Sequence, residues 1–331
     1  MGKMPGETAL KRILFITSNR LGDAVLSLGV LAHLLDEYPG ARTTVVCGPV
    51  PAGLFAAVPG LERVIELPKR KHSLHWWEMW RKCVGTCWDV VVDLRNAPLS
   101  YALLSKRQIH LGKANKKYLH RVVAMGSLVG RADNPPVPQL WSTPEHDAAA
   151  AKLIPDGTPV LALGPTANWI GKTWYADRFV ELALRLTAED GILSGGRIAV
   201  MAHTSELEMA QPVLDALPRD RILNLVGDIP LATVGACLRR ASFYIGNDSG
   251  LMHMAAAAGI PTLGLFGPSR EDLYAPWGGE GGKLAMSVRG DKALDELFPP
   301  DYDYRNTPSL MGDLSVDKAE QAAKELWSRL T

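Results

Sequence analysis

The sequence predicts an α/β protein with two doubly wound domains that face each other across a cleft. Strand-sized apolar runs alternate with amphipathic helical stretches along the chain, which is typical of parallel sheets covered by helices. At 331 residues, the chain is too long for one typical core and suits two domains of about 150 residues. The proline-rich stretch 134–144 must stay extended. We therefore expect domains at 1–142 and 143–331.

The first half opens as a strand, a turn and a helix. Residues 13–17 form an apolar run, and a helix is expected from 24 to 38, where Pro39-Gly40 ends it. Its apolar residues form one stripe: Leu21, Val25, Leu28, Ala32 and Leu35. The next apolar runs predict strands at 43–47, 64–67 and 88–94, with a short helix near 54–60. The opening unit is a right-handed βαβ crossover without the Gly-x-Gly-x-x-Gly dinucleotide fingerprint.

The second half continues the alternation. Strands are expected at 159–163, 197–202, 222–225, 243–245 and 262–266. The helices expected between and after them are 145–153, 176–189, one opening at 203–208, 231–240, 251–258 and 316–330. Residues 268–312, rich in Gly, Pro and Tyr, are expected to be loops.

The turn between the strand 243–245 and the helix 251–258 has the chemistry of an anion site. Asn247, Asp248 and Ser249 are helix-capping residue types, and Gly259 ends the helix. Ligands of open α/β sheets bind at the carboxyl ends of strands, and free N–H groups at a helix start attract anions. Gly250 lets a phosphate approach the backbone, the Ser249 hydroxyl can donate, and His253 follows one turn later. Asp248 suits ligand hydroxyls, which indicates an anion that carries a sugar. An ordinary capped helix remains the alternative.

This turn resembles a family signature. Asn-Asp-Ser-Gly-Leu-Met-His-x-Ala-Ala-Ala at 247–257, with Leu-x-x-Phe-Gly-Pro-Ser at 263–269, is similar to that of the family 9 glycosyltransferases. These are the ADP-heptose:lipopolysaccharide heptosyltransferases, and the residues of the motif are most similar to those of the heptosyltransferase II branch. The resemblance implies a GT-B fold, in which two Rossmann-like domains face each other. It also suggests that helix 316–330 packs back on the first domain.

Two further motifs agree in order. Asn19-Arg-Leu-Gly-Asp23 resembles the amino-terminal Gly-Asp motif, whose aspartate is the proposed base. Asp23 at a helix start has favourable helix electrostatics as its structural alternative. Residues 164–174 resemble the family segment that ends Lys-x-Trp, in which Lys172 neutralises the donor diphosphate; the spacing is not that of a Walker loop.

The resemblance implies a metal-independent, inverting transfer of heptose, or a related sugar, from a nucleotide diphosphate donor, with ADP-heptose expected. Asp23 is the expected catalytic base, and no cofactor is required. The expected donor-binding residues are Thr166, Lys172, Glu208 (for the ribose), Asp248, Ser249, Gly250, Leu251 and His253. The exact branch, the acceptor and the sugar stay open.

Charge is unevenly distributed. Residues 1–140 contain 19 basic against 10 acidic side chains, and the remainder is acidic. A basic half suggests an anionic partner, which could be nucleic acid, an anionic glycolipid or a membrane surface. The resemblance favours a lipopolysaccharide-core glycolipid and no nucleic acid. The candidate acceptor residues are Lys69, Arg70, Lys71, Arg107 and Lys113. Trp76, Trp77 and Trp80 lie on an expected helix that either packs on the sheet or touches the inner membrane surface.

Other classes are less compatible with the sequence. No apolar run is long enough for a transmembrane helix, and no signal peptide is recognisable, so we expect a cytoplasmic protein. Cys83-x3-Cys87 lacks a second ligand pair, so no metal site is expected. Three alternatives remain: another GT-B nucleotide-sugar enzyme such as a UDP-sugar 2-epimerase, a two-lobed solute-binding protein, and a non-catalytic phosphate-binding regulator.

Overall fold

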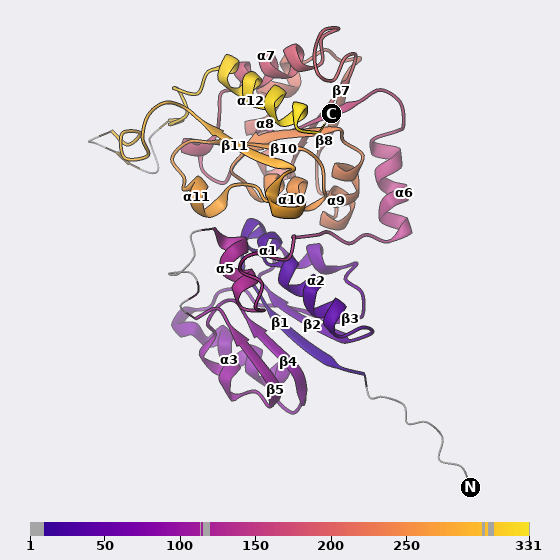
Figure 1. The fold of residues 1–331 in the computed structure, drawn as a ribbon, viewed down its shortest axis with the longest axis vertical. Coiled ribbons are helices and arrows are strands. Elements are labelled where there is room, and N and C mark those ends of the chain that lie inside the picture. The colour runs from indigo at the N-terminus through magenta and orange to yellow at the C-terminus, as the bar shows by residue number, and fades with distance from the viewer. Residues whose placement is uncertain (1–9, 113, 115–119, 300–301, 304–307, 331) are drawn as a thin grey trace.

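Two parallel β-sheets, each covered by helices, make up the protein (Figure 1). The computed structural model describes residues 10–112, 114, 120–299, 302–303 and 308–330. The first sheet lies below the second in Figure 1. This arrangement agrees with the predicted fold class, while the division at residue 142 stays a prediction.

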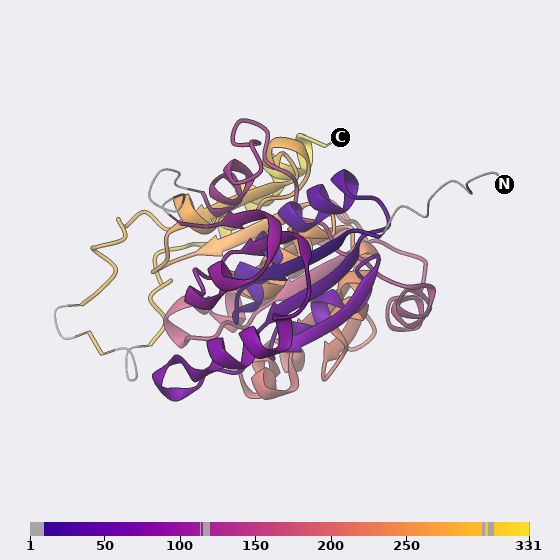
Figure 2. The ribbon, with the colours of Figure 1, turned by 90° about the horizontal axis from the view of Figure 1, so that it is seen from below.

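The first sheet has the strand order β3-β2-β1-β4-β5, and every neighbouring pair is parallel. Its strands are β1 (Arg12–Ile16), β2 (Arg42–Cys47), β3 (Leu61–Glu66), β4 (Trp88–Asp93) and β5 (Ser105–His110). Figure 2 shows this sheet from below. Successive side chains of a strand point to opposite faces of the sheet. Phe15 therefore packs in the buried cluster on one face, and Leu14 in the cluster on the other.

Helices cover both faces of this sheet. α1 (Leu21–Leu26), α2 (Leu28–Glu37) and α5 (Arg121–Ser127) contribute to the cluster that holds Phe15. α3 (Leu74–Cys83) and the 3-10 turn η3 (Pro98–Ala102) border the cluster that holds Leu14. Two more 3-10 turns are η1 (Ala52–Phe55) and η2 (Lys71–Ser73).

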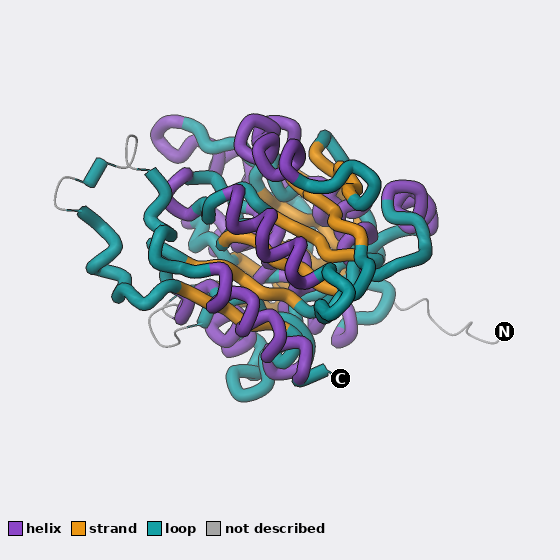
Figure 3. The backbone as a smooth tube through the Cα atoms, turned by 90° about the horizontal axis from the view of Figure 1, so that it is seen from above, coloured by secondary structure: helices purple, strands orange, loops and turns teal. Residues whose placement is uncertain are grey.

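The second sheet has the order β11-β10-β9-β6-β7-β8, again parallel throughout. Its strands are β6 (Val160–Gly164), β7 (Arg197–Ala202), β8 (Ile222–Val226), β9 (Phe243–Asn247), β10 (Thr262–Phe266) and β11 (Ala285–Arg289). Figure 3 shows these strands between helices. Its 3-10 turns are η4 (Ile170–Lys172), η5 (Thr204–Glu206) and η6 (Glu280–Gly282).

The helices of the second sheet also divide between its faces. α6 (Pro144–Leu153), α9 (Leu231–Arg239) and α10 (Gly250–Ala257) belong to the core cluster shared with the first sheet. α7 (Ala176–Leu186), α8 (Leu207–Ala216) and α12 (Val316–Ser328) contribute to the opposite cluster. α12 contacts α7, β10 and β11, so the suggestion that the last helix packs on the first domain is wrong. Its apolar stripe, which includes Ala319, Ala323 and Leu326, is buried there.

Two other expectations need correction. The helix expected at 24–38 is two helices that begin at Leu21 and break at Ser27, whose hydroxyl donates to the Ala24 carbonyl at 2.6 Å. The stretch 268–312, expected to be loops, contains the short helix α11 (Glu271–Tyr274) and strand β11.

The two sheets meet through α1 and α10, which pack against each other. α1 follows the carboxyl end of β1, and α10 follows that of β9. The carboxyl edges of the two sheets therefore face one another, as Figure 1 shows, and they carry the turns where α/β proteins bind ligands.

Candidate active site

Asn247 ties the start of α10 to the loop that carries Lys172. Its side chain is fully buried at the end of β9. Its Nδ2 donates to the Pro165 carbonyl at 2.8 Å, and its Oδ1 accepts from the Trp174 backbone N–H at 3.0 Å. Buried polar groups that are fully paired specify one arrangement of the backbone. Asn247, which the sequence suggested as a cap, therefore joins the two predicted donor motifs.

Lys172 and Asp248 form an ion pair within these motifs. Lys172 ends η4, and its Nζ lies 2.5 Å from Asp248 Oδ2. The Asp248 side chain is 9% exposed and that of Lys172 is 24% exposed. Ser249 is the N-cap residue of α10, yet its side chain makes no capping hydrogen bond. The Lys172–Asp248 pair thus lies directly before Ser249 and the start of α10.

A glutamate is hydrogen-bonded to Thr166, but it is not the predicted one. The buried Thr166 donates from Oγ1 to Glu206 Oε2 at 3.0 Å, and the His203 backbone N–H donates to the same oxygen at 3.3 Å. Glu208 is exposed in the first turn of α8 and has no hydrogen bond or ion pair within the described part of the chain. Glu206, and not Glu208, reaches Thr166 because the capping turn η5 fixes its side chain, and the sequence does not show which carboxylate turns inward.

Glycines allow α1 and α10 to approach closely. A methyl group at Gly250 would lie 2.8 Å from Leu21, and one at Gly22 would lie 2.8 Å from His253 Cδ2. Gly250 was expected to admit a phosphate; the structure shows that it admits Leu21. Leu251 follows it and is half-buried.

His253 is buried at this contact between the sheets. Its Nδ1 has no hydrogen-bond partner within the described residues. Burial lowers the pKa of His253 to about 4, although the nearby Asp248 carboxylate acts in the opposite direction. His120 and Lys172 reinforce the lowering. The imidazole is therefore neutral at physiological pH.

Asp23 lies in the first turn of α1, on the side of the first sheet. The Ser18 hydroxyl donates to Asp23 Oδ2 at 3.4 Å. Burial raises the pKa of Asp23 above its ordinary value, against the opposing effects of Arg20, Arg121 and the Ser18 hydrogen bond; Asp248 raises it further. A raised pKa makes a carboxylate a stronger base, so the environment of Asp23 suits proton removal.

Three further polar side chains lie at the carboxyl edge of the first sheet, and none of them was a predicted site residue. Asn19 follows β1, Arg95 follows β4, and His110 ends β5. Each has a buried atom without a hydrogen-bond partner among the described residues: Asn19 Oδ1, Arg95 Nη1 and His110 Nδ1. His110 Nδ1 lies 3.6 Å from Asp93 Oδ2, beyond hydrogen-bond distance. The Arg95 guanidinium also lies over the Trp76 ring, 4.6 Å from its centroid. Buried polar atoms are nearly always hydrogen-bonded, so these unpaired atoms call for an explanation. A polar ligand bound at this edge would provide one. Their position directly after strands was the available signal.

The predicted acceptor residues do not gather at one place. Lys69, Arg70 and Lys71 are exposed between the carboxyl end of β3 and α3. Arg107 lies in the first half of β5 and binds Glu37 at the end of α2 with an Nη1–Oε1 distance of 2.9 Å, away from the carboxyl edge. Lys113 lies outside the described residues.

A second contact between the sheets involves α5. His120 caps α5 through Nδ1, which accepts from the Val122 N–H, so its Nε2 carries the hydrogen donated to the Ala275 carbonyl at 3.0 Å. Arg121 Nε donates to the Tyr274 hydroxyl at 3.3 Å. These contacts lie beside the site, because Arg121 influences Asp23 and His120 influences His253 electrostatically. Because these contacts join residues more than 150 positions apart, no local sequence pattern predicts them.

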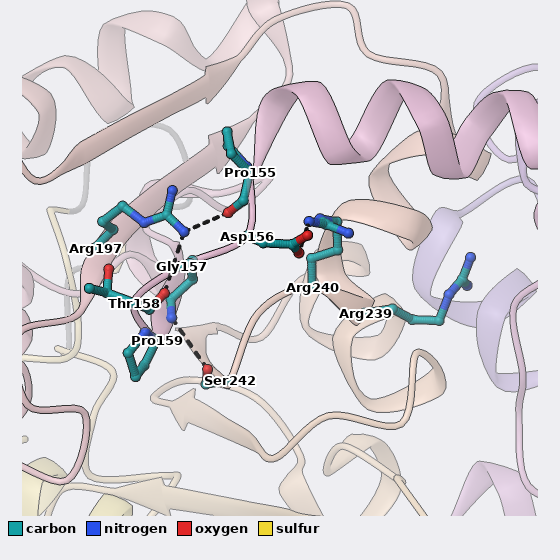
Figure 4. A pocket seen from close by; sticks show the side chains of 10 residues that line it. Pro155, Asp156, Gly157, Thr158, Pro159, Arg197, Arg239, Arg240 and Ser242 are labelled. Atoms are coloured by element: carbon teal, nitrogen blue, oxygen red, sulfur yellow. Dashed lines mark hydrogen bonds and ion pairs between the residues drawn. The ribbon is translucent and has the colours of Figure 1, made fainter.

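A pocket of about 420 Å³ lies at the opposite edge of the second sheet (Figure 4). Arg197 donates there to the Pro155 carbonyl, and Arg240 forms an ion pair with Asp156. Its arginines thus hold the loop between α6 and β6. The pocket is at the amino ends of the strands and includes none of the predicted site residues.

The described residues contain no cluster of three or more His, Cys, Asp or Glu side chains that could hold a metal ion. Within the same residues, every helix is too short or too polar to cross a membrane.

Comparison with known proteins gives one consistent result. The family model "Glycosyltransferase family 9 (heptosyltransferase)" matches residues 81–291. The chain is 25% identical over 323 residues to lipooligosaccharide heptosyltransferase 2 of Haemophilus influenzae, covering 85% of this chain and 92% of that protein.

Solved structures share the fold. ADP-heptose lipopolysaccharide heptosyltransferase II of Escherichia coli superposes with a TM-score of 0.70 at 19% identity, covering 97% of this chain and 99% of the other. A second heptosyltransferase of Escherichia coli, solved with ADP, gives a TM-score of 0.69 at 18% identity, covering 95% and 99%. The predicted GT-B fold and the family resemblance are confirmed.

Proposed function

The chain belongs to glycosyltransferase family 9 (heptosyltransferase), and on that premise we propose that it transfers heptose from ADP-heptose to an anionic glycan of the lipopolysaccharide core. The observation that carries this proposal is the placement of Asp23 and the Lys172–Asp248 pair on facing turns. Asp23 belongs to α1, which packs on α10, and Asp248 precedes α10. A base on one sheet thus faces an anion-binding arrangement on the other.

The donor, in this proposal, lies against the second sheet. Lys172 and the Ser249 hydroxyl bind the diphosphate, with the first N–H groups of α10 at Gly250 and Leu251 adding partial positive charge. The carboxylates of Glu206 and Asp248 accept hydrogen bonds from donor hydroxyls, and Thr166 holds Glu206 in place. Glu206 replaces Glu208 as the proposed ribose ligand. Support for ADP comes from the relative that was solved with this nucleotide.

The proposed reaction is a single displacement. The acceptor hydroxyl oxygen attacks the anomeric carbon while the bond from that carbon to the diphosphate oxygen breaks. ADP leaves with the electron pair, and Asp23 takes the hydroxyl proton. Attack opposite the leaving group inverts the anomeric configuration. Lys172 and the α10 dipole supply positive charge to the leaving diphosphate, so the proposed step needs no metal.

The acceptor, in this proposal, lies along the carboxyl edge of the first sheet. Arg95 binds an anionic group of the acceptor, and Asn19 Oδ1 and His110 Nδ1 bind its hydroxyls, which would pair the atoms that lack partners. The exposed stretch 69–71 adds long-range attraction for an anion.

The expected cytoplasmic location stays a prediction.

The test combines ADP-heptose with two lipopolysaccharide cores, one that lacks heptose and one that carries a single heptose. We expect mass spectrometry to show one added heptose on one of these cores and nuclear magnetic resonance to show an inverted anomeric centre; two unmodified cores, or a retained configuration, would contradict the proposal. Donor choice can be checked separately by thermal shift. ADP at 100 times its Kd should add about 2.7 kcal/mol to the free energy of unfolding, whereas UDP and GDP should add less.

A further inference from the structure

The outward face of α3 is unusually apolar for an exposed helix. Leu74, Trp77, Arg81 and Val84 follow at steps of three, four and three residues, so they share one face. Leu74 is 59% exposed, Trp77 53% and Val84 44%. The opposite face, with His75, Met79 and Cys83, is buried. The helix therefore has a second stripe, apolar except for Arg81, that the described part of the chain leaves about half exposed; Trp77 stacks on Trp80 with a ring-centroid distance of 5.0 Å.

Neighbouring residues extend this apolar surface. η3 contacts α3, and Tyr101 and Leu104, in and after η3, are 59% and 71% exposed. Five of the eleven exposed large apolar side chains among the described residues thus belong to these two adjoining segments. Exposed apolar side chains concentrated in this way mark a contact surface rather than ordinary scatter.

The charge around this surface is strongly positive. Residues 69–82 contain five basic side chains and one acidic side chain, Glu78. Glu78 is shared by Arg70 and Lys82. Lys69, Lys71 and Arg81 form no ion pair within the described residues, and all three are exposed. A partner that covers α3 must therefore supply negative charge.

We propose that this α3 face, Leu74, Trp77, Arg81 and Val84 with Lys69 and Lys71, binds the surface of an anionic lipid bilayer. Trp and Leu on one face of a helix with Lys and Arg around it are the composition of interfacial helices, which lie in the headgroup region. Leu74 and Trp77 enter that region, while the basic side chains meet the anionic headgroups. A second copy of this chain fits less well, because it would bring the same positive charge.

The position of α3 leaves the candidate site free. α3 packs on the face of the first sheet opposite α1, α2 and α5, and it lies far from the second sheet in Figure 1. The chain enters α3 from the carboxyl end of β3, on the same edge as Asn19 and Arg95. A bilayer on α3 thus lies beside this edge without covering α1 or α10. Vesicle binding needs neither donor nor acceptor, so it can be tested independently of the proposed transfer.

Sedimentation with vesicles provides the test. The full-length protein should bind vesicles of phosphatidylcholine doped with phosphatidylglycerol, and not vesicles of phosphatidylcholine alone. Leu74→Ser/Trp77→Ser should lower the partition coefficient at least tenfold, since it removes the apolar surface that the bilayer would bury. Lys69→Ser/Lys71→Ser/Arg81→Ser should lower it about fivefold per residue, and added salt should weaken wild-type binding. Leu207→Ser and Lys152→Ser, exposed on α8 and α6, are matched controls that should bind like wild type.

Two results would overturn the proposal. One is wild-type protein that stays in the supernatant with anionic vesicles, or serine variants that pellet as wild type does. The other is a wild-type dimer, seen by analytical ultracentrifugation, that Trp77→Ser converts to a monomer; this would assign the face to a second copy. ADP affinity checks the fold of each variant. If Leu74→Ser/Trp77→Ser fails to fold, the charge variant, confined to exposed positions, decides alone.

Discussion

Lys172 Nζ lies 2.5 Å from Asp248 Oδ2, so the lysine proposed for the leaving diphosphate is already paired with a carboxylate. Removing the lysine alone leaves the buried Asp248 carboxylate without its cation. Stability and donor binding are therefore linked at this pair, and a double variant can separate them.

Lys172→Met should weaken ADP binding by about 10- to 100-fold, since a charge-assisted contact to phosphate contributes about 1.5–3 kcal/mol. It should also lower the free energy of unfolding by about 1–3 kcal/mol, through the unpaired carboxylate. Lys172→Met/Asp248→Asn should recover stability but not affinity. Titration calorimetry and urea unfolding measure the two effects, with Lys152→Met as control. Wild-type ADP affinity in Lys172→Met would remove the lysine from the site.

Asn247→Ala should destabilise the protein by about 2–4 kcal/mol, because both buried side-chain hydrogen bonds to the 165–174 loop are lost. ADP affinity should fall as well, since the loop carries Lys172. Urea unfolding checks the first effect, and Asn224→Ala, at an exposed asparagine that also accepts from a backbone N–H, is the control. If Asn247→Ala loses stability yet binds ADP normally, the lysine loop is held by other contacts.

Asp23→Asn should lower kcat by about 10²- to 10⁴-fold while ADP binding persists, as expected for loss of a general base. Because the folded-state pKa of Asp23 is raised, its stability contribution is full below the unfolded pKa and is lost as pH rises through the folded pKa. At neutral pH the variant should thus be at least as stable as wild type. Wild-type kcat should decline with acidification already above the ordinary Asp pKa. A folded variant that keeps more than about a tenth of kcat, with chemistry rate-limiting, would contradict the base role.

His253→Gln should make stability less sensitive to acid. The pKa of His253 is depressed to about 4, so its contribution is full above the unfolded pKa of 6.5 and is lost as pH falls toward 4. Wild-type protein should lose stability in this window, and the variant should lose less of it. Thermal unfolding between pH 4 and 7 checks this, with His72→Gln, at an exposed position, as control. Parallel profiles for wild type and His253→Gln would show that His253 does not titrate differently on unfolding.

Arg95→Met should raise the acceptor KM by about 10-fold or more and leave donor Kd unchanged, because Arg95 is proposed to bind an anionic group of the acceptor. Methionine replaces the guanidinium over the Trp76 ring with a neutral thioether that also packs on aromatic rings. Arg107→Met provides the comparison, since Arg107 is paired with Glu37 away from this edge. Steady-state kinetics with varied acceptor measure both variants. An effect in Arg107→Met and none in Arg95→Met would favour the position expected from the sequence.

Local motifs made the central strands and the positions of Lys172, Asp248 and Ser249 predictable, while their role in donor binding stays a proposal. Lys172, Asp248 and Ser249 are fixed by their place after β6 or β9, so sequence order alone brings them to one edge. The missed strands β5 and β11 are both at an end of their sheet, where one side needs no strand partner and polar residues are tolerated. Their sequences, Ser-Lys-Arg-Gln-Ile-His and Ala-Met-Ser-Val-Arg, lack a continuous apolar run.

The residues missed at the site depend on tertiary contacts. Glu206 and Glu208 are equivalent in sequence, and only the η5 turn directs Glu206 to Thr166. His120 meets Ala275 across 155 residues of chain. No periodicity encodes such pairings, which exist only once both sheets are formed.

The close contact of Gly22 with His253, and of Leu21 with Gly250, also has a mechanical meaning. Any swing of one sheet relative to the other that preserves these contacts must turn about an axis that passes near them. Atoms close to an axis travel least, so Asp23 would keep its distance from Asp248 through such a swing. α3 and α12 lie on the outer faces, far from the axis, so the same rotation would displace them most. Under that constraint the outer parts of the two sheets separate, while Asp23 and the Lys172–Asp248 pair stay nearly stationary beside the pivot.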